Sequence, residues 1–221
     1  MKKIAVLLGW LLVLPLILTG PVQASTLTFY INTPFPDNPD PDGPAPWLTA
    51  LFEDQPDGKV QLTLSANLSA SDFVSNWYFN VDPSFQGSLS FQYLGGGTDP
   101  ATIYSNPNPS PDKDTNLKAD GDGYFDFKFT FPTSEDSRFE GTESYQYLIS
   151  SDIQLYASFF NFPSAPGGGN GIWHTAAHIQ GISGGLSAWV GDGPQVPIPG
   201  AIWLLGSGLL GLAALRRRQS N

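Results

Sequence analysis

"KVQLTLSA", residues 59–66, alternates strictly between polar and apolar side chains. "GYFDFKFTF", residues 123–131, repeats the pattern with four phenylalanines at alternate positions. Side chains with a period of two point to opposite faces of an extended chain, so both segments predict half-buried antiparallel strands. The apolar faces predicted from this pattern consist of Val60, Leu62, Leu64 and Ala66 in the first segment and of Phe125, Phe127, Phe129 and Phe131 in the second.

The same pattern recurs along the body of the chain, residues 25–195, and no long stretch repeats apolar residues at helical spacing. Further strands are predicted at residues 27–31, 47–53, 73–80, 88–94, 102–105, 144–149, 153–160, 171–180 and 186–190. Loops rich in Pro, Gly and Asp separate them, and the prolines of residues 32–46 exclude a central strand there. We therefore predict an all-β protein with a single antiparallel β-sandwich domain, jelly-roll-like in type.

The charge of the chain is strongly acidic and unevenly distributed. The net charge is −10, with 10 Lys+Arg and 20 Asp+Glu, and five of the cations lie in the two terminal segments. Such a body is repelled by phosphate backbones, so we predict no nucleic acid as a partner. Divalent cations and neutral sugars remain possible partners. The absence of cysteine excludes a disulfide framework, a thiolate zinc site and a cysteine nucleophile.

The first 24 residues have the three parts of a secretory signal peptide. Lys2 and Lys3 form a basic start, residues 4–18 form an apolar core interrupted by Pro15, and small or modest side chains end at Ala24. This order predicts export and cleavage after Ala24. A retained N-terminal anchor is the alternative, although the apolar core is short for a membrane span.

A second apolar run, residues 199–215, is just long enough to cross a bilayer, and it stops at Arg216, Arg217 and Arg218. Because positive residues remain cytoplasmic, both termini are predicted inside and the acidic body outside the inner membrane. A buried core helix is the alternative, but such a helix is not uniformly apolar and then abruptly tri-basic at the end of a chain.

The residues around this run carry a family resemblance. Val196, Pro197, Ile198 and Pro199 precede "WLLGSGLLGL" and then "LRRR". This order resembles the PEP-CTERM sorting signal and is closest to the variant written VPLPA. Ile198 stands where the commonest form has Glu, and Gly200 replaces Ala. The resemblance implies recognition by an exosortase, a membrane transpeptidase-like enzyme, cleavage near the proline motif, and a Gram-negative host that makes exopolysaccharide.

The chain thus divides into a signal peptide, residues 1–24, a β-sandwich, residues 25–195, and a sorting signal, residues 196–221, with a transmembrane helix that contacts the inner membrane transiently. We predict a non-catalytic protein of the cell surface, outer envelope or extracellular matrix, associated with exopolysaccharide or biofilm and anchored in the membrane before processing. The body, in residues 73–83, 122–132 and 160–182, also resembles domains found attached to such signals. A lectin-like, glycan-binding sandwich is the alternative from another class, and a secreted glycan hydrolase is a third.

Apart from Ca²⁺, no cofactor is predicted. "DKDTNLKADGDGYFD", residues 112–126, places hard oxygen ligands at alternate positions, which suits Ca²⁺. Leu117 and Gly123 stand where an EF-type loop needs Gly and Glu, so the predicted site is a looser one, and a solvated turn is the alternative. Its predicted ligands are Asp112, Asp114, Asn116, Asp120 and Asp122. A second acidic loop contains Asp37, Asp40 and Asp42.

Two motifs have the appearance of catalytic or metal sites. "GISGG", residues 181–185, matches G-x-S-x-G around Ser183, but a hydrolase of that type needs a later His, and both histidines come earlier, so we predict a tight turn. "HTAAH" contains His174 and His178, which share a face on a helix but lie about 13 Å apart on a strand. Thr175 also stands where a zinc protease needs Glu. We predict packing or surface histidines.

Carboxylate pairs and tryptophans are the remaining candidates for glycan chemistry. The four glutamates mostly fall in predicted loops, which argues against a paired acid and base. The tryptophans either stack on sugar rings or fill the core, and we favour the core for most of them. The residues concerned are Glu53, Glu135, Glu140, Glu143, Trp47, Trp77, Trp173 and Trp189.

Overall fold

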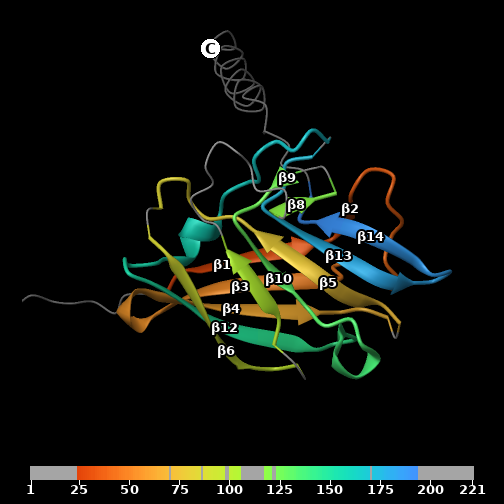
Figure 1. Cartoon of the computed structure of the whole chain (residues 1–221), viewed down its shortest axis with the longest axis horizontal. Coiled ribbons are helices and arrows are strands. Elements are labelled where there is room, and N and C mark those ends of the chain that lie inside the picture. The colour runs from red at the N-terminus through yellow and green to blue at the C-terminus, as the bar shows by residue number, and fades with distance from the viewer. Residues whose placement is uncertain are drawn as a thin grey trace, which may run out of the picture.

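The computed structural model describes residues 24–69, 71–85, 87–97, 100–105, 117–120, 123–169 and 171–193. Two antiparallel sheets pack face to face (Figure 1). The predicted all-β, sandwich-like class is therefore confirmed. The predicted signal peptide before Ala24 and the sorting signal, residues 196–221, lie outside the described residues. Among the residues that are described, no helix has the length and hydropathy needed to cross a bilayer.

The first sheet is built around the segment with the strictest alternation. Its strand order is β1 (Thr26–Ile31), β3 (Leu48–Gln55), β4 (Lys59–Ala66), β12 (Ser144–Ser151) and β6 (Leu89–Gly95). Strand β4 coincides with the predicted residues 59–66, and its apolar side chains are buried while its polar ones are half-buried. The alternation of polar and apolar residues therefore decides which face of this sheet packs against the core.

The second sheet has the order β2 (Thr33–Pro34), β14 (Leu186–Gly191), β13 (Thr175–Ile182), β5 (Phe73–Phe79), β10 (Phe127–Thr130) and β7 (Thr102–Ser105). Strand β11 (Phe139–Glu140) also pairs with β5, and the short strands β8 (Lys118–Ala119) and β9 (Gly123–Tyr124) form a small third sheet. Pro34 lies in the edge strand β2, in agreement with the predicted absence of a central strand there.

Aromatic side chains fill the space between the two main sheets. Phe52 of the first sheet stacks on Phe160 at a ring-centroid distance of 4.6 Å and meets Phe79 of the second sheet edge-on at 5.5 Å. A smaller apolar cluster covers the outer face of the second sheet; it contains Phe35, Tyr78, Ala119, Phe125, Trp173 and Ala176. Strand β5 is consequently buried on both faces, with Trp77 inside and Tyr78 outside.

The predicted strand at residues 123–131 is divided in the structure. Phe125 belongs to the outer cluster, whereas Phe127 and Phe129 belong to the core between the sheets. The chain changes layers at Asp126, whose carboxylate accepts a hydrogen bond of 2.8 Å from the backbone N–H of Val81. The alternation is present, but the two halves of the segment pack against different partners.

Two other predicted strands differ from the structure. Residues 153–160 are not a strand, because the N–H of Leu155 donates to Gly58 and the N–H of Ala157 donates to the Asp54 carboxylate. The segment ends in the 3₁₀ helix η4 (Ala157–Phe160). The strand predicted at residues 171–180 begins only at Thr175. Before that point the N–H of Trp173 donates to the Ser164 hydroxyl rather than to a neighbouring strand.

Candidate functional site

The predicted sorting and calcium residues fall mostly outside the described part of the chain. The proline motif, the three terminal arginines, Asp112, Asp114, Asn116 and Asp122 lie there, so those predictions stay predictions. Ala24 is the first described residue and is exposed. Asp120 adopts a positive φ of 41° and accepts a hydrogen bond of 3.4 Å from the Asn38 amide.

The β13–β14 hairpin holds both histidines and Ser183, but it keeps them apart. His174 comes one residue before β13, His178 lies within it, and Ser183 begins the turn that joins the two strands. The prediction of a tight turn at residues 181–185 is confirmed. The chain there passes from strand to strand, whereas a hydrolase nucleophile of the G-x-S-x-G type needs a passage from strand to helix.

At the open end of this hairpin, one carboxylate organises the start of β13. Asp192 accepts a hydrogen bond of 2.8 Å from the ring Nδ1 of His174. Its other oxygen accepts the backbone N–H of His174 at 3.1 Å and that of Thr175 at 3.4 Å. The His174 ring also stacks on Phe29, with the centroids 5.5 Å apart. The imidazole is therefore held on one edge and on one face.

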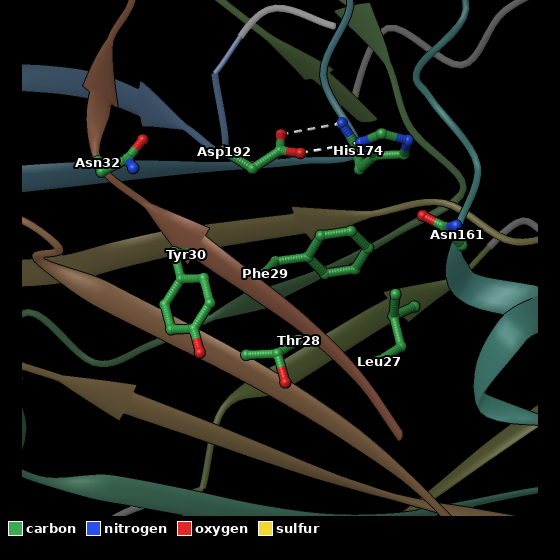
Figure 2. A pocket seen from close by; sticks show the side chains of 8 residues that line it. All are labelled: Leu27, Thr28, Phe29, Tyr30, Asn32, Asn161, His174 and Asp192. Atoms are coloured by element: carbon green, nitrogen blue, oxygen red, sulfur yellow. Dashed lines mark hydrogen bonds and ion pairs between the residues drawn. The ribbon is translucent and has the colours of Figure 1, made fainter. Parts of the chain in front are cut away.

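This pair forms one wall of an open pocket of about 350 Å³, at the lower end of the range of ligand sites. Figure 2 shows β1 along one side, His174 and Asp192 along another, and Asn161 at the end of η4. Tyr30 is 56% exposed. The pocket is lined by Leu27, Thr28, Phe29, Tyr30, Asn32, Asn161, His174 and Asp192. It thus combines aromatic surface with amide, hydroxyl and carboxylate groups.

The pocket offers an oriented imidazole, and no hydroxyl among the described residues hydrogen-bonds to its ring. Among the described residues, the ring of His174 hydrogen-bonds only to Asp192. A nucleophilic triad requires a hydroxyl or thiol within about 2.6–3.2 Å of the other ring nitrogen. The arrangement in the described structure therefore supplies a hydrogen-bonding edge for a ligand.

His178 has a different partner. Its Nδ1 lies 2.9 Å from the Ser75 hydroxyl, at the point where the register between β13 and β5 shifts by a bulge. Its ring stacks on Trp189 at 4.7 Å, and burial lowers the pKa of His178. Ser75 is only 4% exposed. Because this hydroxyl is buried, a substrate does not reach it. We interpret the Ser75–His178 contact as one that stabilises the bulge.

At the closed end of the hairpin, Ser183 binds an acidic loop. Its backbone N–H and its hydroxyl both donate to Oδ2 of Asp42, at 2.9 and 2.7 Å. These hydrogen bonds lower the pKa of Asp42. The backbone N–H of Asp42 in turn donates to Oδ2 of Asp72 at 2.8 Å. Burial raises the pKa of Asp72, and the neighbouring Asp42 charge adds to this rise.

The remaining candidates are placed as follows. Trp47, Trp77 and Trp173 are buried, so they fill the two cores and do not stack on sugars from the surface. Glu140 and Glu143 share one turn, in which the N–H of Glu140 donates to the Glu143 carboxylate at 3.2 Å. Within the described residues, no three Asp, Glu or His side chains gather in a geometry that holds a metal.

The sequence argument missed two pairings that define the ends of the hairpin. Residues that lie equally far from the turn of a hairpin face each other, so the predicted turn at residues 181–185 contained a signal for the His174–Asp192 pair. No comparable signal links Asp42, Asp72 and Ser183, which are far apart in sequence and meet only through packing. Comparisons with known protein families, with curated proteins and with solved structures found no match.

Proposed function

We propose that this chain is an exported, non-catalytic protein of the cell surface or extracellular matrix, sorted by an exosortase-type enzyme and associated with exopolysaccharide. The observation that carries the proposal is the order of three features at the C-terminal end. A V-P-I-P motif, an apolar run and three arginines follow within 30 residues of Gly191, the last residue of β14. The acidic, cysteine-free body is consistent with it.

The proposal assigns separate roles to the two apolar segments. The first, ending at Ala24, starts export and is removed; the second holds the chain in the inner membrane until the proline motif is processed. Strand β1 begins at Thr26, so cleavage after Ala24 leaves the complete first sheet in the mature protein. Within this proposal the sandwich is jelly-roll-like, because strands distant in sequence, such as β4 and β12, lie side by side.

The test is the location and the ends of the protein in a host with an exosortase. Mass spectrometry of the mature protein is expected to find Ser25 at its N-terminus and a C-terminus near Val196–Pro199. Deletion of residues 196–221 is expected to leave a soluble periplasmic protein. Unchanged surface display of the deletion variant would contradict the role assigned to the tail.

A matched variant separates the proline motif from the apolar run. Changing Pro197→Ala together with Pro199→Ala keeps the membrane span and the arginines. This variant is expected to accumulate unprocessed in the inner membrane, unlike the deletion. Normal processing of the double variant would show that the motif is not what the enzyme recognises, whereas loss of membrane retention would point to a role in insertion.

A second function, the lectin-like one, is favoured by the pocket beside β1. Neutral sugars bind to exposed aromatic faces rimmed by amides and carboxylates, and Tyr30, Asn161 and Asp192 supply these groups. An acidic body does not repel a neutral polysaccharide. We therefore propose that, if this protein binds exopolysaccharide directly, one neutral sugar unit occupies this pocket.

Calorimetry of the purified protein with exopolysaccharide fragments, with and without EDTA, tests this second function. Tyr30→Ala and Asn161→Ala are expected to weaken binding by about tenfold each, which is the loss of one good contact. Tyr104→Ala is the matched control, because Tyr104 is also an exposed tyrosine but lies in β7 of the other sheet. Absence of binding in both conditions would exclude the lectin-like function.

A further inference from the structure

Three segments that are distant in sequence meet at the closed end of the β13–β14 hairpin. Ser183 of the hairpin turn binds the Asp42 carboxylate, and the Asp42 N–H binds the Asp72 carboxylate. A Cβ added to Gly43 would lie 2.9 Å from the Ser69 hydroxyl, so the acidic loop packs directly against Ser69. Two carboxylates and two serine hydroxyls therefore gather at one junction.

Among the described residues, one oxygen at this junction has no hydrogen-bond partner. Asp72 is 0% exposed, and its Oδ2 accepts the Asp42 N–H, whereas within the described residues its Oδ1 makes no hydrogen bond of good geometry. A buried carboxylate oxygen without a partner costs free energy, and a native protein normally satisfies it with a donor, a proton or a cation.

A group that binds Oδ1 of Asp72 also lies close to the carboxylate of Asp42. The two hydrogen bonds from Ser183 both end on Oδ2 of Asp42, which leaves Oδ1 for another contact. The two carboxyl groups interact directly, and each affects the titration of the other. A positive charge between them removes their repulsion and satisfies the buried oxygen at the same time.

We propose that Asp42 and Asp72 form a divalent cation site, and that its natural ion is Ca²⁺. Both ligands are hard carboxylate oxygens, which Ca²⁺ accepts in irregular geometry with water filling the remaining positions. Mg²⁺ demands a near-ideal octahedron at short distances, so carboxylates whose positions are fixed by other hydrogen bonds, and not by the metal, favour Ca²⁺ over Mg²⁺. Ser183 is a positioning residue that fixes the Asp42 carboxylate.

Such an ion would hold three segments together at one end of the sandwich. Only two carboxylates contribute charge, so the affinity is expected in the range of extracellular calcium modules, about 10⁻⁴–10⁻³ M. The strongly acidic body raises the local concentration of cations around the site. This proposal is independent of the glycan pocket, which lies at the other end of the same hairpin.

The test is thermal unfolding of the full-length chain in detergent with EDTA, 10 mM Ca²⁺ or 10 mM Mg²⁺. Calcium is expected to raise the midpoint of the wild-type protein by about 3 °C and magnesium by less. Asp72→Asn and Asp42→Asn are expected to abolish the calcium effect. Asp40→Asn is the matched control, because it removes the same charge from the same loop without touching the junction, and it is expected to keep the effect.

A direct measurement of ion binding to the wild-type chain tests the proposal even if a variant folds poorly. Terbium luminescence of the wild-type chain, with competition by Ca²⁺, is expected to report one site that Asp72→Asn removes. An equal calcium effect in all variants would place the ion elsewhere, for instance in the predicted loop at residues 112–122, and would overturn the proposal. No calcium effect, together with stabilisation on acidification that Asp72→Asn removes, would show that a proton occupies the gap and would overturn it as well.

Discussion

The two ends of the β13–β14 hairpin hold buried carboxylates in opposite situations. At the open end, Asp192 accepts three N–H groups, one from the His174 ring and two from the backbone. At the closed end, Asp72 accepts the N–H of Asp42 on one oxygen, and its other oxygen has no partner within the described residues. A buried carboxylate stabilises the fold when donors match its oxygens, and it is a cost when they do not.

The largest expected effect is at the matched end. Asp192→Ala leaves the backbone N–H groups of His174 and Thr175 and the His174 ring without their acceptor. Because the side chains of His174 and Asp192 are only 14% and 7% exposed, water does not fully replace it. We expect a loss of about 3 kcal/mol in the free energy of unfolding, measured by urea denaturation.

Asp192→Asn sharpens this prediction, because the amide oxygen still accepts from the backbone N–H groups. Its amide NH₂ group faces His174 Nδ1. This nitrogen accepts a hydrogen bond from the amide once the imidazole proton is on Nε2. We expect a loss of only about 1 kcal/mol. Equal losses in the alanine and asparagine variants would mean that the negative charge, rather than the set of hydrogen bonds, stabilises this end.

Asp126 is an intermediate case, because it is largely buried and accepts one hydrogen bond, from the N–H of Val81. Burial raises the pKa of Asp126 to about 6. The folded protein thus retains a proton that the unfolded chain releases near pH 4, so the stability contributed by this group is complete below pH 4 and is lost as the pH rises through 6.

Asp126→Asn is therefore expected to stabilise the protein by about 2 kcal/mol at pH 7.5, because the amide keeps the Val81 hydrogen bond and carries no charge. At pH 4 the variant and the wild type are expected to differ little. Urea denaturation at both pH values measures the difference. Destabilisation at pH 7.5 would show that the ionised carboxylate is satisfied by groups other than the Val81 N–H.

The strand predictions succeeded where local alternation alone decides the packing, and they failed where tertiary partners decide it. Residues 59–66 form a strand because both neighbouring strands follow the same alternation. Phe125 and Phe127 fit one alternating pattern, yet they enter different clusters, because a second apolar layer covers the outer face of the second sheet. The alternation within residues 123–131 contains no sign of this layer.

The candidate sites show the same limit. Residues 181–185 were predicted as a tight turn because the order of Ser and His excluded a hydrolase, and this argument needs no three-dimensional contact. The partners of Ser183 could not be predicted, since Asp42 is 141 residues away in the chain. Packing brings such residues together, so single-sequence patterns identify candidate residue types but not their partners.

The smallest expected effect concerns Asp54, a carboxylate near the surface that is satisfied by two backbone groups. It accepts the N–H of Ala157 at 2.6 Å and that of Ser25 at 3.2 Å. If cleavage follows Ala24, the Ser25 nitrogen becomes an ammonium group beside this carboxylate. An exposed ion pair of this kind contributes about 0.5 kcal/mol.

We expect protein that begins at Ser25 to be more stable, by this amount, than the same protein acetylated at Ser25. The difference should vanish in Asp54→Asn and shrink in high salt, both measured by urea denaturation. A difference that persists in Asp54→Asn would mean that the new terminus acts through another group, and that Asp54 only orders the loop before η4.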